Sequence, residues 1–422
     1  MPTPLAFKAL TYNFKINDRL CKLPISHNPK SNQFVITKLT SASKAQYSAW
    51  FFNVFFLFLT CTMGSSGYVV IRQFIKPKQH ITMVHTILYT MISGAGSIVA
   101  GIVVYVVKYG EEAVDRVNWL VWFHEEQLKG TVVTSAKMKV KKAKKPPIWR
   151  NLSGDLDTFG LAMSAVFFPL PYIPLIAVPF GMIANLDVYK FVLEDFIPTA
   201  VYELIIVQIV IRSISAVIAY ICFAESVRIF PMIGYLAVLP IQLLTRIVGK
   251  MGKIDLTCRP ISHILSVLYS YTQISSLVLA MQENDATSNF LLLQTGIWLG
   301  AGSIYGTIRL HNVVPLGFYL IFPFFILIVL IITEQLLPVI VSILENSKTS
   351  LAQWVTQLSG NGRPEDKCLR RYFTAMRPIR YVAGLNGNYF YDIDNSIMTS
   401  FLCSILDNAI NLLMSLPVVH VA

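Results

Sequence analysis

The stretch VPLGFYLIFPFFILIVLIITEQLLPVIVSI, residues 314–343, marks this chain as a membrane protein, because its only charged side chain is Glu334. A helix rises about 1.5 Å per residue, so about 20 apolar residues cross the hydrocarbon core of a bilayer. Six further stretches are long and apolar enough to do the same. The seven predicted spans are 50–71, 81–107, 158–184, 200–224, 290–308, 314–343 and 396–419.

The composition agrees with a polytopic membrane protein. The 422 residues are 54% hydrophobic and 14% charged, whereas ordinary globular domains are about 25% charged. The net charge of +12 is typical of cytoplasmic loops and of surfaces near anionic headgroups, so we expect no nucleic-acid binding. The first 47 residues contain no apolar core of a cleavable signal peptide, and the first span is therefore predicted to be a signal anchor.

The 35 Lys and Arg residues predict the orientation of the chain. The N-terminal tail and alternate connections carry 29 of them, and the connections on the other side carry only five: Arg72, Lys76, Lys78, Lys190 and Arg309. Cytoplasmic loops carry the excess of Lys and Arg. We therefore expect a cytoplasmic N-terminus and an extracellular C-terminus, which is opposite to the orientation of G-protein-coupled receptors.

The predicted organisation is an all-α polytopic membrane protein with seven transmembrane helices and a helical cytoplasmic layer. Its parts are a cytoplasmic tail (1–49), spans one to four (50–224) with a basic cytoplasmic loop (108–157), a cytoplasmic helical extension (225–289), spans five and six (290–343), a cytoplasmic anchor segment (344–395), and span seven with a short outer tail (396–422).

Two regions beside the spans are harder to assign. Residues 229–249 and 261–281 are almost long enough to cross a bilayer, but polar residues and prolines interrupt them. We interpret them as an extension of span four and a cytoplasmic helix. If both crossed, there would be nine spans with the same end orientations, whereas a single crossing would place the basic segment 346–395 outside, against the charge rule.

Three local patterns predict further detail. Apolar residues at helical spacing over 111–128 indicate that span two continues as a cytoplasmic helix. Segment 346–395 is predicted to contain a helical piece over 351–358 and a break at 360–364. Beyond the break, a basic helix is predicted to carry Arg370, Arg371, Arg377 and Arg380. Span three is predicted to be kinked or broken, either beside a ligand cavity or for purely structural reasons, by Pro169, Pro171, Pro174 and Pro179.

Span seven carries a polar stripe. Its members recur at intervals of three and four and therefore share one face of a helix: Ser400, Ser404, Asp407, Asn411 and Ser415. An aspartate near the centre of a span costs about 2.5–3.5 kcal/mol on insertion scales and usually faces protein or water. Two interpretations remain open: Asp407 is buried between helices, with Arg212 as a candidate partner, or it lines a pore in a symmetric oligomer.

The C-terminal segment GNYFYDIDNSIMTSFL, residues 387–402, resembles the segment that leads into the last helix of the insect gustatory and odorant receptor superfamily. That family closes with Thr-Tyr, five hydrophobic residues and Gln-Phe. The corresponding residues 407–415 of this chain read DNAINLLMS, so all four signature residues differ. The orientation, the chain length, the short outer loops and the cytoplasmic layer extend the resemblance to the whole chain, as a divergent gustatory-receptor-like protein.

The resemblance implies a ligand-gated, non-selective cation channel of four like or related subunits in the plasma membrane, without a cofactor or metal. Its pore-lining residues on the last helix would be Ser400, Ser404, Asp407, Asn411 and Met414. Small-molecule ligands would enter a pocket in the outer halves of earlier spans, for which the candidate residues are His85, Tyr89, Tyr172, Tyr202, Glu203, Gln208, Tyr319 and Phe322. Each of these side chains also fits an ordinary place in an aromatic belt or core.

Other classes fit the sequence less well. No phosphate-binding loop, metal-binding histidine pattern or nucleophile elbow is present, so we expect no enzyme activity. A secondary transporter with a substrate path near Glu203, Arg212 and Asp407 remains the alternative, because intramembrane charges and broken helices also mark such paths.

Overall fold

The structure is a computed structural model that describes residues 4–17, 21–28, 33–36, 41–78, 80–135, 158–257, 259–311, 316–360 and 364–415. The chain divides into two compact units. Unit one contains residues 1–119, 136–237 and 419–422, and unit two contains residues 120–135 and 238–418. Two long helices contribute residues to both units, α4 (Met83–Ser135) and α9 (Ile205–Met251).

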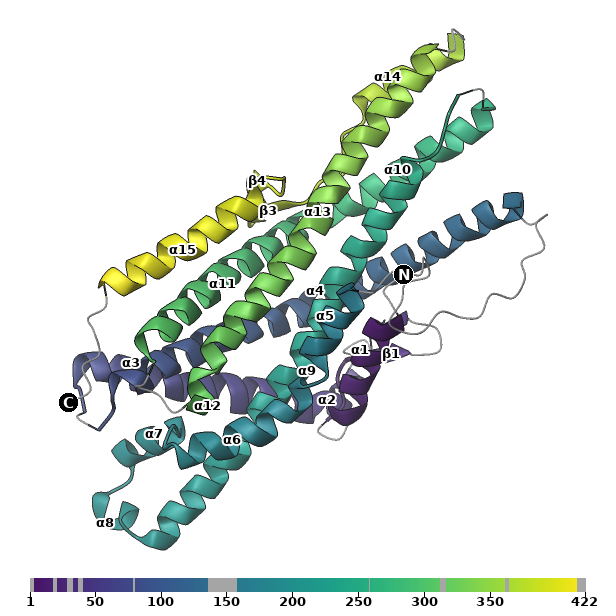
Figure 1. Ribbon diagram of the computed structural model, residues 1–422. Helices are drawn as coiled ribbons and strands as arrows, with labels where there is room; N and C mark the ends of the chain where they lie inside the picture. The colour runs from purple at the N-terminus through teal and green to yellow at the C-terminus, as the bar shows by residue number, and fades with distance from the viewer. Residues whose placement is uncertain are drawn as a thin grey trace. The chain divides into compact units, whose positions relative to one another are not determined.

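Unit one is built from helices and one small hairpin (Figure 1). Besides parts of α4 and α9, its elements are α1 (Pro4–Asn17), β1 (Ile25–Asn28), β2 (Gln33–Ile36), α2 (Ser41–Phe51), η1 (Phe52–Met63), α3 (Gly64–Ile75), α5 (Thr158–Phe167), η2 (Leu170–Tyr172), α6 (Ile173–Ile183), α7 (Val188–Phe196) and α8 (Thr199–Tyr202).

The N-terminal segment is folded onto the helices of unit one. Helix α1 packs on α5, and β1 pairs with β2 in an antiparallel register from Ile25 with Ile36 to Asn28 with Gln33. The Asn118 side chain accepts a hydrogen bond from the Phe34 N–H at 3.2 Å and donates one to the Phe34 carbonyl at 2.9 Å. These two hydrogen bonds to the backbone of β2 connect the hairpin to helix α4.

Unit two holds the C-terminal helices. Its elements are α10 (Ile261–Ala280), α11 (Gln282–Arg309), α12 (Leu316–Tyr319), α13 (Ile321–Gly360), α14 (Pro364–Ala375), β3 (Val382–Leu385), β4 (Asn388–Asp392) and α15 (Ile397–Ser415). Helices α11, α13 and α15 run side by side (Figure 1). Their core contains Leu293, Val329, Leu337, Ala383, Phe401 and Ile405.

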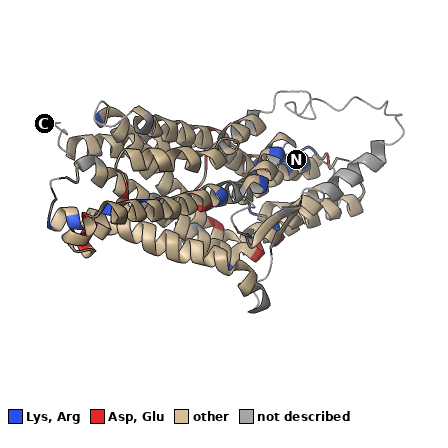
Figure 2. Cartoon of the chain, turned by 90° about the horizontal axis from the view of Figure 1, so that it is seen from below, with Lys and Arg blue, Asp and Glu red and all other residues tan. Residues whose placement is uncertain are grey.

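The predicted helical, multi-span fold is confirmed. Six helices of the described residues are long and apolar enough to cross a membrane: Ala45–Ile75, His85–His124, Met163–Ile183, Ile205–Ile229, Ile321–Gly360 and Ile397–Ser415. The predicted fifth span lies in α11, which passes the same test together with α10 as a pair bent by 60°. Long stretches of the helices carry no charged residue (Figure 2). The orientation of the ends and the division into membrane and cytoplasmic parts stay predictions.

Several local expectations are confirmed. Span two continues without a break to Ser135 in α4, and span four continues to Met251 in α9; the remainder of the predicted basic loop, residues 136–157, lies outside the described residues. Span three is interrupted, because α5 gives way to η2 and then α6 around Pro169 and Pro171. The missing proline N–H groups and the ring bulk account for this break.

The predicted basic helix in segment 346–395 is shorter than expected. Helix α14 contains Arg370 and Arg371 but ends at Ala375, so Arg377 and Arg380 lie beyond it. Pro378 explains the end, because the residue before a proline is disfavoured in the helical region. Arg380 instead pairs with Asp392 at 2.8 Å across the β3–β4 hairpin, whose turn residues Asn386 and Gly387 have positive φ angles of 50° and 79°, a turn suited to twisted hairpins.

In unit two, an aromatic cluster joins α10, α13 and α14. Trp354 of α13 is fully buried between Tyr271 of α10 and Phe373 of α14, with ring centroids 5.9 Å and 5.3 Å away. The Ser347 hydroxyl contacts the Tyr271 hydroxyl at 2.7 Å and accepts the Ile379 N–H at 2.8 Å. The predicted helical piece over 351–358 is therefore part of α13, packed against its neighbours.

Candidate functional site

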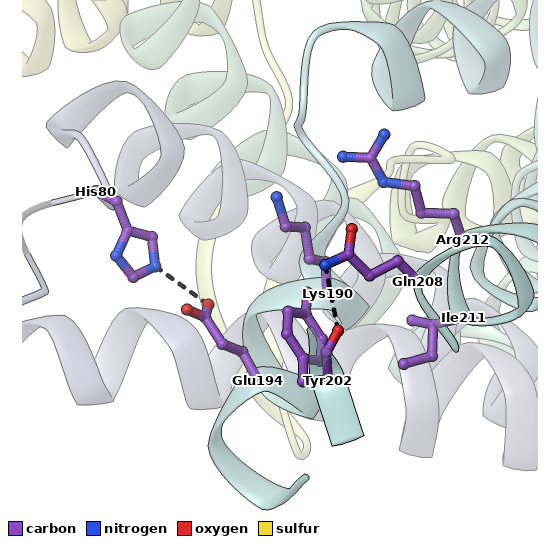
Figure 3. Close-up of a pocket in the computed structure, with 7 residues that line it drawn as sticks. All are labelled: His80, Lys190, Glu194, Tyr202, Gln208, Ile211 and Arg212. Carbon is purple, nitrogen blue, oxygen red and sulfur yellow. Dashed lines mark hydrogen bonds and ion pairs between the residues drawn. The ribbon is translucent and has the colours of Figure 1, made fainter. Parts of the chain in front are cut away.

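A cavity of about 310 Å³ lies in unit one, between α7, α8 and the first turns of α9. That volume is at the lower end of the range for small-molecule pockets, about 300–1,000 Å³. The lining side chains come from α7, α8, α9 and the connection before α4, and Figure 3 shows them: His80, Lys190, Glu194, Tyr202, Gln208, Ile211 and Arg212. Two predicted ligand residues, Tyr202 and Gln208, are among them.

The sequence places these side chains by helical spacing. Lys190 and Glu194 are four residues apart on α7, and Gln208 and Arg212 are four apart on α9, so each pair shares one helix face. Asp187 begins α7 as an N-cap, because its side chain accepts the Tyr189 N–H at 3.0 Å. Burial raises the pKa of the Asp187 carboxyl.

An ion network borders the cavity on one side. Asp195 pairs with Arg72 and, at 2.6 Å, with Lys78. Glu194 lies 3.7 Å from Lys78 and 3.2 Å from His80. Loss of solvation on burial lowers the pKa of Lys78, while Glu194 acts in the opposite sense. Arg72 and Lys78, two of the five basic residues of the predicted outer side, are thus neutralised by acids of α7.

The two cations on the cavity wall, Lys190 and Arg212, have no ion-pair partner in the described residues. Arg212 donates a hydrogen bond to the neutral Asn185 amide oxygen at 2.9 Å, and within the described residues no carboxylate lies in ion-pair range of its guanidinium. The Lys190 ammonium has no hydrogen-bond or ion-pair partner in the part of the chain that the structure describes. Gln208 donates to the Tyr202 carbonyl at 3.2 Å.

Two other predicted ligand residues of unit one, His85 and Tyr89, belong to a cluster of aromatic rings. His85 and Tyr89 of α4 pack on Phe191 of α7, with ring centroids 5.3 Å and 6.2 Å away. Tyr89 is fully buried, and its hydroxyl has no hydrogen-bond partner in the described residues. Beside them, the Tyr189 and Thr62 hydroxyls are 2.7 Å apart.

The remaining predicted ligand residues lie elsewhere. The Tyr172 hydroxyl is 2.5 Å from that of Tyr12 on α1, and Glu203 is exposed in the turn between α8 and α9. Tyr319 and Phe322 belong to unit two, where the Tyr319 hydroxyl donates to the Thr307 carbonyl at 3.2 Å and Phe322 is buried against Gly306. The assignment of these residues to a ligand pocket stays a prediction.

The predicted pore helix, α15, has two unlike faces. Phe401, Ile405 and Ala409 are buried and recur every four residues, and Gly296 and Gly300 of α11 face Phe401 and Ile405. The predicted pore residues lie outside that buried row: Ser400, Asp407, Asn411 and Met414 are exposed and Ser404 is half-buried. Within the described residues Asp407 has no ion-pair partner, which leaves its carboxylate open to solvent or to another chain.

Sequence reasoning missed five of the cavity residues as ligand candidates: His80, Lys190, Glu194, Ile211 and Arg212. Lys190 entered only as a basic residue of the outer side, and Arg212 only as part of a transporter path. The four-residue spacing of Lys190 and Glu194 was the available signal. It could not show that Glu194 turns to Lys78 and His80, since those residues are more than 100 positions earlier in the chain.

Comparisons with known proteins bear on the fold. No protein-family model and no curated protein sequence matches the chain significantly. Among solved structures, the chain is similar to the insect olfactory receptor OR5 from Machilis hrabei in complex with eugenol, with a TM-score of 0.55 and 11% sequence identity over 97% of this chain and 98% of that chain. The chain therefore has the fold of an insect olfactory receptor along nearly its whole length, and the resemblance inferred from residues 387–402 is confirmed at that level.

Proposed function

We propose that this protein is a chemosensory, gustatory-like receptor of the plasma membrane that acts as a ligand-gated, non-selective cation channel. Four subunits would surround a pore lined by α15. The observation that carries the proposal is the polar face of α15, where Ser400, Asp407 and Asn411 are exposed while the opposite row packs on α11. An acid at the middle of a span is costly against lipid and is stabilised where it meets water.

The charge of this face favours cations. One Asp407 from each of four subunits would form a ring of carboxylates, and such rings select cations in channels. The olfactory receptor of similar fold was solved with eugenol bound, which supports a small molecule as the stimulus. The cavity in unit one is a candidate place for it. Helices α4 and α9 contribute to both units and are candidates for coupling the stimulus to the pore.

Whole-cell and single-channel recordings on cells that express the protein test this function. Ligand-evoked unitary currents carried by Na⁺ and K⁺ are expected. Uptake of a substrate without unitary currents would instead establish a secondary transporter, the alternative that involves Glu203, Arg212 and Asp407.

Asp407→Asn tests the pore assignment. Loss of the carboxylate ring is expected to lower the single-channel conductance and to reduce the preference for cations over anions, because the local negative potential disappears. The measurements are unitary current and reversal potential in a salt gradient. Glu365→Gln, which removes an exposed acid of α14, is the matched control and should leave both unchanged. An Asp407→Asn channel with unaltered conductance and selectivity would show that α15 does not line the pore with this face.

A further inference from the structure

The cavity in unit one carries more cationic than anionic charge. Of its lining residues, Lys190 and Arg212 are cations and Glu194 is the acid. The surplus persists when the ion partners are included. Arg72 and Lys78 pair with Asp195, and Lys78 also lies near Glu194, so Arg72, Lys78, Lys190 and Arg212 stand against two acids. It persists even with the buried Asp187 counted as ionised, since these four cations face only three acids. This surplus does not depend on the protonation state of His80.

The surplus charge is located at one wall. Figure 3 shows the Lys190 ammonium and the Arg212 guanidinium on the side of the cavity away from the His80–Glu194 pair. Glu194 is the natural partner for Lys190 one helical turn earlier, but it pairs with His80 at 3.2 Å and Lys78 at 3.7 Å instead. Lys190 is thereby left with three unused donors.

The other wall groups suit the rest of a small organic molecule. Ile211 is buried and offers an apolar side chain, and Tyr202 is half-buried with a ring and a hydroxyl. A volume of about 310 Å³ accommodates a compact ligand rather than a long chain. Ligand sites typically combine apolar contact with a few placed polar groups.

We propose that this cavity binds a small organic monocarboxylate, whose carboxylate group accepts hydrogen bonds from Lys190 and Arg212 while its hydrocarbon part contacts Ile211 and Tyr202. A single negative charge matches the surplus of one positive charge that remains when Asp187 is counted as ionised. Charge-assisted hydrogen bonds to a carboxylate are about twice as strong as neutral ones, so the carboxylate should distinguish this ligand class from neutral odorants of the same shape. The proposal narrows the ligand class of the proposed receptor and relies on that function only for an electrical readout.

Binding measurements on the full chain in phosphatidylcholine nanodiscs test the site directly. The probes are hexanoate and benzoate, with hexanamide and benzamide as neutral counterparts of similar shape. Titration calorimetry should detect both carboxylates, with the amides at least about tenfold weaker. Lys190→Gln should weaken carboxylate binding about tenfold or more, and Lys190→Arg should retain it. Lys76→Gln, which removes an exposed lysine of the neighbouring connection, should bind like the wild type.

Three results would overturn the site. They are no carboxylate binding to the wild type, equal binding of amide and carboxylate, and equal losses in Lys190→Gln and Lys76→Gln. An anionic headgroup could offer similar chemistry, so the titration is repeated with phosphatidylserine in the nanodisc. Abolition of hexanoate binding there would assign the cavity to lipid and refute the soluble ligand.

Recordings separate this proposal from the channel function. Carboxylate binding without any current would leave the site standing and refute the channel. Currents evoked by neutral compounds, unchanged in Lys190→Gln and without carboxylate binding, would leave the channel standing and refute the site.

Discussion

At the scale of single residues, unit one contains a buried polar cluster outside the cavity. The Glu225 and Arg228 side chains are each 2% exposed and form an ion pair at 2.5 Å. Arg228 also donates to the Cys21 carbonyl at 2.5 Å and to its sulfur at 2.9 Å, while the Cys21 thiol donates to Glu225 at 3.0 Å. The cluster therefore fastens the segment before β1 to helix α9.

Arg228→Met is expected to destabilise the protein strongly. The substitution leaves the Glu225 carboxylate buried without its partner, and breaking one side of a buried ion pair typically costs about 3–5 kcal/mol. Thermal unfolding in detergent, followed by the loss of monodisperse protein, measures the effect. The double variant Glu225→Gln with Arg228→Met removes the uncompensated charge and should recover much of the stability. Equal losses in the single and double variants would show that packing, not charge, explains the defect.

Cys21 is expected to react slowly with thiol reagents. Burial raises the pKa of its thiol to about 11, and the neighbouring Glu225 acts in the same direction while Arg228 opposes it. The reactive thiolate is therefore scarce at about pH 8 and increases as the pH approaches the pKa. Maleimide labelling followed by peptide mass spectrometry should modify the exposed Cys368 well before Cys21. Labelling of Cys21 as fast as Cys368 at that pH would contradict the cluster.

At the scale of elements, the docking of α15 on α11 depends on glycines. A Cβ atom at Gly296 would come within 2.8 Å of the Phe401 ring, and one at Gly300 within 3.1 Å of the Ile405 side chain. At Gly302, two residues further along the same helix, a Cβ would meet nothing within 4 Å. The close approach of the two helices therefore requires small residues at two positions and not at the third.

Gly296→Ala and Gly302→Ala form a matched pair that tests this packing. Gly296→Ala should force Phe401 to move and destabilise unit two by about 1–3 kcal/mol, as overpacking does. Gly302→Ala should be neutral or stabilising by up to about 1 kcal/mol, because alanine favours helices over glycine. Unfolding temperatures of the purified variants measure both. The packing of α15 on α11 would be refuted if the two substitutions had the same effect.

At the scale of the whole molecule, the distribution of basic residues predicts the topology. Epitope tags at residues 1 and 422 should lie on opposite sides of the plasma membrane, the first stained only after permeabilisation and the second on intact cells. The reason is the excess of Lys and Arg in the N-terminal tail and alternate connections. A tag at residue 137, in the basic loop, is the control and should behave like the tag at residue 1. Staining of both ends on intact cells would overturn the orientation.

Much of the fold was predictable because it depends on periodicity and hydrophobicity along the chain. The apolar runs predict the helices, the proline cluster predicts the break before α6, and apolar spacing predicts that α4 continues past its span. The polar stripe of residues 400–415 likewise follows from helical spacing alone, and the structure places its exposed members away from the row that packs on α11. Hydrophobicity and helical spacing both depend on residues close together in the sequence, and a folded helix keeps these residues on the same face.

The cavity and the buried clusters were decided only by the tertiary structure. Glu194 pairs with His80, and Lys190 is therefore left without an ion partner in the described residues. The thiol that contacts Glu225 and Arg228 belongs to Cys21. Both arrangements join residues that lie more than 100 positions apart in the sequence. Pairing of charges depends on distances and burial in three dimensions, and helical spacing carries no information about them. Hydrophobicity and helical spacing along the chain suffice to predict a multi-span helical protein with a polar last helix, whereas folding sets which of its charges are neutralised and which are left without an ion partner in the described residues.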